Sequence, residues 1–166
     1  CLNTALHHAV CFGYARITTL LLERGADQTI PDNAGMTPLH EAAQHARAGI
    51  VRLLIARGAD ARVRDRRGET PLHRAAYWYH YPLYRLRAAL GACKALLDAG
   101  AGINARDNEG NTPLHLAAAN EGDAHGVLTR FLLSRGADPN ARNSEGKTPA
   151  EIASSPAKAR FLRPTE

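Results

Sequence analysis

The sequence contains few cysteines and no long hydrophobic run. Its three cysteines, Cys1, Cys11 and Cys93, are odd in number and widely spaced. This pattern argues against a disulfide framework or a zinc site and favours reduced thiols. Reduced thiols are typical of intracellular proteins, so we expect a cytoplasmic or nuclear location. No apolar stretch approaches the roughly 18 residues that a membrane-spanning helix needs, and no secretory signal is visible.

Lysine is also scarce. The 166 residues include 3 lysines beside 18 arginines and 16 acidic residues, and the formal net charge is +5. A charge of this size does not by itself indicate nucleic-acid binding. The hydrophobic content of 45% is ordinary for a soluble protein, and the length predicts about one domain.

A four-residue pattern recurs along the chain. Thr-Pro-Leu-His occurs at residues 37–40, 70–73 and 112–115, and altered forms occur at 4–7 and 148–151. The five occurrences are spaced by 33, 33, 42 and 36 residues, which indicates stacked repeat units. We predict one domain over residues 1–166, with units 4–36, 37–69, 70–111 and 112–147 and a C-terminal cap 148–166.

Each full unit has the pattern of two helices and a turn. In the second unit, Thr37 can cap a first helix and Pro38 suits its first position. An apolar run over residues 50–55 predicts a second helix, which Gly58 ends in the left-handed conformation. Glycines at equivalent positions in the four full units all stand 12 residues before the next motif threonine: Gly25, Gly58, Gly100 and Gly136. The constant spacing predicts a fixed geometry between neighbouring units.

These motifs resemble the ankyrin repeat, whose signature is T-P-L-H-x-A with a period of about 33 residues. The resemblance covers residues 3 to about 155. It implies an all-α solenoid of helix-turn-helix units joined by β-hairpin fingers, with a concave face formed by the fingers and the first helices. It also implies recognition of a partner protein or peptide on that face.

The two ends of the repeat array depart from the pattern. Unit one has Ala5 in place of proline and only three residues before it, so we expect further repeats or a cap upstream in the parent protein. Unit five loses the motif histidine. A polar last helix containing Lys158, Arg160 and Arg163 would suit a C-terminal cap, which repeat stacks need for solubility.

Unit three contains an aromatic insert at about residues 79–87. Four of the five tyrosines and the single tryptophan lie between residues 77 and 84. We predict that the second helix begins near Pro82 instead of near Leu90, with Tyr81 and Tyr84 partly in the core. A disordered loop is the alternative.

The histidines predict structural roles. Those of the motif recur once per unit, so stacking would keep them apart, and we expect each to form a hydrogen bond beside its motif threonine. They are His7, His40, His73 and His115. The group of His7, His8 and Cys11 offers too few ligands for a structural zinc ion. We therefore predict no catalytic residue, no metal site and no cofactor, and hence no enzyme.

An arginine-rich connector is the first candidate binding element. It contains Arg62, Arg64, Arg66 and Arg67, and Arg74 follows it. These side chains would suit an acidic peptide, because guanidinium groups hold carboxylates with two parallel hydrogen bonds. The alternative is a solvated charged turn with local ion pairs, which would contribute little to stability.

The first helices supply the other candidates. Tyr77 and Trp78 fall at positions that face the groove in the family fold, and large aromatic residues often anchor interfaces. The alternative for both is that they pack the lengthened helix pair against units two and four. Glu41 and His45 lie at groove positions of unit two, and they complete the predicted partner-binding set.

The function that we predict is recognition of a protein or peptide, with an acidic partner favoured. One alternative is a regulatory or substrate-presenting segment of a larger enzyme or effector, which would dock on other domains of the same parent chain. Another is nucleic-acid contact through the arginine-rich connector. This third hypothesis is the least favoured binding role, and it requires an affinity that falls steeply with salt.

Overall fold

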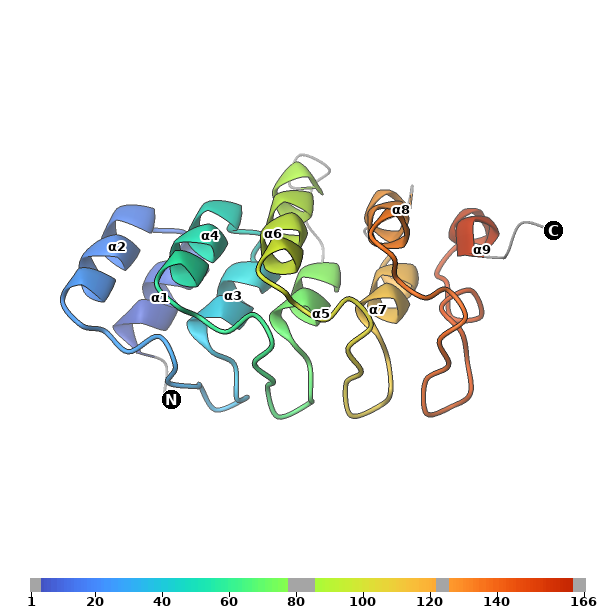
Figure 1. Ribbon diagram of the computed structural model, residues 1–166, viewed down its shortest axis with the longest axis horizontal. Helices are drawn as coiled ribbons and strands as arrows, with labels where there is room; N and C mark the ends of the chain where they lie inside the picture. The colour runs from blue at the N-terminus through green and yellow to red at the C-terminus, as the bar shows by residue number, and fades with distance from the viewer. Residues whose placement is uncertain (1–3, 78–85, 122–125, 163–166) are drawn as a thin grey trace.

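The computed structural model describes residues 4–77, 86–121 and 126–162. Within these ranges the chain is built from helices and turns, as the predicted all-α solenoid requires. The helices stand in two rows, and loops project from one side of the stack (Figure 1). The predictions made for Trp78, Tyr81, Pro82, Tyr84 and Arg163 lie outside the described residues.

The helices form one pair in each full unit, followed by a last helix. Their bounds are α1 (Ala5–Phe12), α2 (Ala15–Glu23), α3 (Pro38–Gln44), α4 (Ala48–Ala56), α5 (Pro71–Ala76), α6 (Leu86–Asp98), α7 (Pro113–Ala119), α8 (Val127–Ser134) and α9 (Pro156–Leu162). The first helices α1, α3, α5 and α7 contact one another along the inner row. The second helices α2, α4, α6 and α8 do the same along the outer row (Figure 1).

The second helix of unit three is longer than its counterparts. Helix α6 has 13 residues and α4 has 9. Helix α6 includes Leu86 and so begins before Leu90, while the predicted start near Pro82 lies outside the described residues. The extra length extends the outer row at unit three.

Each motif histidine ties a helix start to the next unit. In unit three, Nδ1 of His73 lies 3.1 Å from the backbone nitrogen of Thr70 and 2.9 Å from its hydroxyl. Nε2 of His73 lies 3.1 Å from the carbonyl oxygen of Asn111, in the following connector. His7, His40 and His115 repeat this pattern with Met36, Glu69 and Lys147. The predicted structural role of the motif histidines is therefore confirmed.

The buried histidines give the stack a pH dependence. Burial lowers the pKa of His40, His73 and His115 below the ordinary value of 6.5. The unfolded chain therefore binds more protons than the folded chain as the pH falls below 6.5, and stability is lost. We expect each of these histidines to lower the free energy of unfolding by up to about 1.4 kcal/mol for each pH unit of acidification in that range. Urea unfolding between about pH 7.5 and about pH 6.0 should show a falling midpoint, and a constant midpoint would contradict this role.

Glycines end the second helices in the predicted left-handed conformation. The φ angles of Gly25, Gly58, Gly100 and Gly136 lie between +81° and +90°. A residue with a Cβ atom is strained at such angles, which explains the regular spacing of glycine in the sequence. The chain then leaves each helix in the same direction toward the next connector.

The projecting loops, which we call the fingers, are held by hydrogen bonds from backbone nitrogens, both within a finger and between neighbouring fingers. In the second finger, Oδ1 of Asp65 accepts hydrogen bonds from the backbone nitrogens of Arg67 and Glu69 at 2.8 Å and 3.0 Å. The backbone nitrogen of Arg66 donates to Ala34 in the preceding finger at 3.0 Å. The described fingers are turns and contain no strand, in place of the β-hairpins that the resemblance implied.

The core runs through the middle of the stack. Leu39, Leu72 and Leu114 on the inner helices are at most 1% exposed, and so are Leu54 and Leu96 on the outer helices. Alanines fill the contact between successive inner helices, at Ala42, Ala75 and Ala117. Their small side chains allow close helix packing, so neighbouring units form one continuous core.

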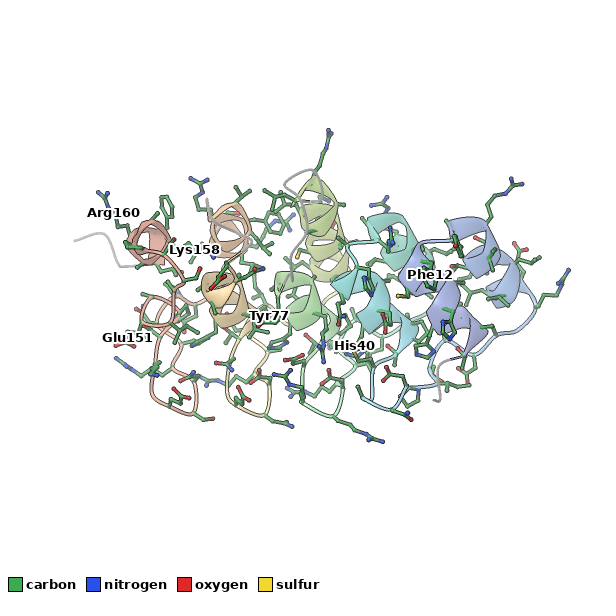
Figure 2. The ribbon with its side chains drawn as sticks, turned by 180° about the vertical axis from the view of Figure 1, so that it is seen from behind. Phe12, His40, Tyr77, Glu151, Lys158 and Arg160 are labelled. Atoms are coloured by element: carbon green, nitrogen blue, oxygen red, sulfur yellow. The ribbon has the colours of Figure 1, made fainter. Side chains whose placement is uncertain are left out.

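Lys158 corrects the predicted character of the last helix. The sequence placed it on a polar surface, but the residue is fully buried. Its ammonium group donates to the carbonyl oxygens of Ala117 and Ala118 at 3.2 Å and to that of Asn120. The last carbonyl groups of α7 have no partners within their helix, and a cation is favourable at that end. Figure 2 shows Lys158 turned toward α7, whereas Arg160 points away from the stack.

Candidate protein-binding surface

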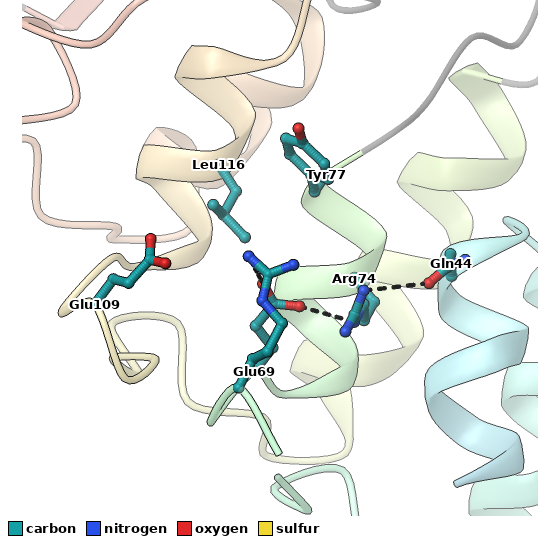
Figure 3. Close-up of a pocket in the computed structure, with 7 residues that line it drawn as sticks. Gln44, Glu69, Arg74, Tyr77, Glu109 and Leu116 are labelled. Atoms are coloured by element: carbon teal, nitrogen blue, oxygen red, sulfur yellow. Dashed lines mark hydrogen bonds and ion pairs between the residues drawn. The ribbon is translucent and has the colours of Figure 1, made fainter. Parts of the chain in front are cut away.

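A pocket opens between the fingers and the inner helices of units two to four (Figure 3). Its volume is about 330 Å³. Its lining comes from three helices and two fingers and consists of Gln44, Arg67, Glu69, Arg74, Tyr77, Glu109 and Leu116. The structure thus brings together Arg67, Arg74 and Tyr77 from the predicted partner-binding set. We call this hollow the concave pocket.

Arg74 forms a buried ion network at the base of the concave pocket. Its guanidinium lies 2.5 Å from Asp65 and 2.8 Å from Glu69, measured between the nearest nitrogen and oxygen atoms. The side chains of Arg74, Asp65 and Glu69 are only 15%, 0% and 5% exposed. A third contact, to the amide oxygen of Gln44, spans 3.5 Å. Arg74 is therefore held by the fold, and its charge is balanced by two carboxylates.

The two carboxylates of this network differ in pKa. Burial by itself would raise the pKa of Asp65, but hydrogen bonds from Arg74 and from the backbone hold it below its ordinary value. Burial raises the pKa of Glu69, although the charges of Arg74 and Arg67 oppose the change. Asp65 is thus the firmly ionised partner of Arg74, because it accepts the larger number of hydrogen bonds.

Two arginines of the predicted connector link successive units. Nε of Arg62 donates to the carbonyl oxygen of Gly100 at 2.8 Å. Nη1 of Arg64 donates to the carbonyl oxygen of Arg106 in the next finger at 2.7 Å. Arg106 donates in the same way to Arg142 at 2.6 Å. Arg64 and Arg106 each stand six residues before a motif threonine. This regular spacing is visible in the sequence and indicates a structural role.

Arg66 and Arg67 are exposed, as are Arg62 and Arg64. The side chain of Arg67 is 63% exposed and lies 3.4 Å from a carboxylate oxygen of Glu69. Arg67 therefore lines the concave pocket with most of its side chain exposed. For both residues, as for Arg62 and Arg64, partner binding stays a prediction.

Tyr77 and Leu116 supply the apolar part of the concave pocket. Tyr77 is half-buried at the end of α5, and Leu116 is half-buried on α7. Figure 3 shows the two side chains extending from their neighbouring helices toward the same space. Trp78, the predicted anchor, lies outside the described residues.

Glu41 and His45 lie away from the concave pocket. They contact each other on α3 and at its end, with Oε2 of Glu41 and Nε2 of His45 separated by 3.2 Å. The sulfur atom of Cys11 lies 3.4 Å from the same histidine nitrogen. The predicted partner-binding residues therefore divide between two places on the inner row.

Stacked helix pairs, projecting fingers and a hollow across the inner helices define this chain as a helical repeat protein. Family models described as "Ankyrin repeats (3 copies)", "Ankyrin repeats (many copies)" and "Ankyrin repeat" match residues 6–86, 96–153 and 67–108. The chain belongs to the ankyrin repeat family, which serves generally in protein–protein interaction. A search of curated proteins found no significant match. Among the described helices, none has the length and apolar character needed to cross a membrane.

Proposed function

We propose that the chain binds a partner protein or peptide through the concave pocket of units two to four. The observation that carries this proposal is the convergence of an exposed arginine, an exposed glutamate and two half-buried apolar side chains on one hollow. Interfaces combine buried aromatic or aliphatic anchors with a polar rim in this way. The concave pocket offers both within a single surface.

The lining defines the chemistry of the partner. An apolar side chain of the partner would pack against Tyr77 and Leu116. A carboxylate would pair with Arg67, whose charge is only partly balanced by Glu69. Glu109, also exposed, would favour a basic group on the opposite side of the hollow. The partner segment would thus carry an acidic group, as the sequence predicted, together with an apolar anchor and a basic group.

The rigidity of the stack supports this mechanism. Hydrogen bonds from Arg62, Arg64 and the motif histidines hold each unit against the next. The stack therefore loses little conformational entropy when a partner binds. Arg74 adds to this effect because its two carboxylate partners fix its position at the base of the concave pocket.

Three further aspects of this function are proposed with it. The role is non-catalytic, and the motif histidines are each engaged in structural hydrogen bonds. The setting is intracellular, which agrees with the free thiols of Cys11 and Cys93. Where the parent chain has other domains, one of them can be the partner that docks on this surface.

Affinity capture from the source cell's lysate tests the proposal. The pocket variant combines Arg67→Glu with Tyr77→Ala. The matched control combines Arg52→Glu with Leu20→Ala, two exposed positions on the outer helices α4 and α2. We expect a protein that the wild type and the control capture and the pocket variant loses. Equal capture by all three would contradict the proposal, and capture that a nuclease abolishes would favour nucleic acid.

A further inference from the structure

Three metal-ligand side chains meet on the inner row between units one and two. Cys11 belongs to α1, Glu41 belongs to α3, and His45 immediately follows α3. Sγ of Cys11 and Oε2 of Glu41 lie 3.4 Å and 3.2 Å from Nε2 of His45. The three atoms all lie within 4.8 Å of one another. We call this group the Cys-Glu-His cluster.

Two polar groups of the cluster compete for the same nitrogen atom of His45. Nε2 of His45 has a single proton or lone pair to offer, yet the thiol and the carboxylate both face it. Oε2 of Glu41 is buried, and although it lies 3.2 Å from Nε2 of His45, it accepts no well-directed hydrogen bond in the part of the chain that the structure describes. A buried carboxylate oxygen without such a bond is costly. A cation placed among the three atoms would satisfy all of them at once.

We propose that the Cys-Glu-His cluster binds a zinc ion in an open site of three protein ligands, one from unit one and two from unit two. Zinc lies about 2.3 Å from thiolate sulfur and about 2.0–2.2 Å from imidazole nitrogen or carboxylate oxygen. Tetrahedral geometry with these bond lengths separates the ligand atoms by about 3.3–3.6 Å. The observed separations of 3.4 Å and 3.2 Å from Nε2 of His45 are close to these values, and the third pair, Sγ of Cys11 and Oε2 of Glu41, lies within 4.8 Å. Three protein ligands leave the fourth position to water.

The charges of the cluster suit a divalent ion. The thiolate of Cys11 and the carboxylate of Glu41 together neutralise Zn²⁺, and His45 binds as the neutral imidazole. The thiol proton therefore goes to solvent when the sulfur–zinc bond forms. Thiolate and imidazole ligands favour zinc over magnesium or calcium, which prefer sets of oxygen ligands.

The same geometry differs from that of a Cys-His-carboxylate triad. A cysteine nucleophile needs a histidine that accepts its proton on one ring nitrogen and is oriented through the other. Here the thiol and the carboxylate both address Nε2 of His45. The sequence predicted no metal site because the ligands come from two units. The available signal was the pair Glu41 and His45, four residues apart on one helix face.

Cobalt titration of the full, tag-free chain tests the proposal. Co²⁺ accepts the same ligands as zinc, and a bound thiolate gives a charge-transfer absorption band. We expect this band to saturate at about one equivalent and to disappear when Zn²⁺, which binds more tightly, is added. Cys11→Ser should abolish it. Cys93→Ser and Cys1→Ser are the matched thiol controls and should retain it. Absence of the band in the wild type, or its survival in Cys11→Ser, would overturn the proposal.

The other two ligands provide an independent test. We expect His45→Ala and Glu41→Gln to weaken Co²⁺ binding by more than about tenfold, since even the loss of a residue that only supports a ligand has that effect. His8→Ala, at an exposed position of α1, should bind Co²⁺ as the wild type does. Circular dichroism without metal verifies that each variant is folded. Unchanged affinity in both ligand variants would show that the metal binds elsewhere.

Discussion

Replacing Arg74 with alanine is expected to destabilise the protein by about 3–5 kcal/mol. The substitution leaves two carboxylates without their main cation, and the side chains of Asp65 and Glu69 are 0% and 5% exposed. A buried charge that has lost its partner costs far more than a surface ion pair contributes. Asp65 also holds the second finger through its backbone hydrogen bonds, so the loss should spread to the contact between units two and three.

Urea unfolding followed by circular dichroism measures this effect against a matched control. Arg67→Ala removes an arginine from the same finger, but its side chain is 63% exposed and we expect a change below about 1 kcal/mol. Adding Asp65→Asn to Arg74→Ala should recover part of the lost stability, because it removes one unpaired charge. Similar small effects for Arg74→Ala and Arg67→Ala would show that the network does not stabilise the stack.

His73→Ala is expected to destabilise the protein by about 3 kcal/mol. It removes the cap at the start of α5 and leaves the carbonyl oxygen of Asn111 without its partner. Loss of a cap costs about 0.5–2 kcal/mol, and an unsatisfied buried polar group costs about 1–3 kcal/mol. The position is central in the stack, so both neighbours of unit three lose contacts.

The same unfolding experiment distinguishes this effect from the loss of any histidine. His8→Ala changes an exposed residue of α1 and should alter stability by no more than about 0.5 kcal/mol. If His8→Ala and His73→Ala lowered the free energy of unfolding by equally small amounts, the motif histidines would not couple the units.

The helix starts and ends were predictable from the sequence because each depends on local chemistry. A motif threonine such as Thr37 caps its helix, Pro38 suits the first turn, and Gly58 ends the second helix in a conformation that other residues avoid. The recurrence of these residues at a fixed spacing then predicts the stacking. For the same reason, the roles of the motif histidines followed from their position beside the threonines.

The features that the sequence did not predict are all contacts between units. Lys158 looks like a surface residue in sequence, and only its position against the end of α7 explains why it is buried. Arg74 pairs with carboxylates of the preceding finger, a contact that depends on how the finger folds back. Cys11 and His45 meet only when α1 packs against α3. Such contacts depend on the rotation between neighbouring units, which local patterns do not encode.

The affinity of a captured partner for Tyr77→Ala, measured by isothermal titration calorimetry, tests the concave pocket most directly. Leu20→Ala serves as the matched control, since Leu20 is 45% exposed on the outer row. Our account predicts that Tyr77→Ala weakens binding by about 2 kcal/mol, or about 30-fold, and that Leu20→Ala has no effect. Wild-type affinity in Tyr77→Ala, or an equal loss in both variants, would contradict recognition through this surface.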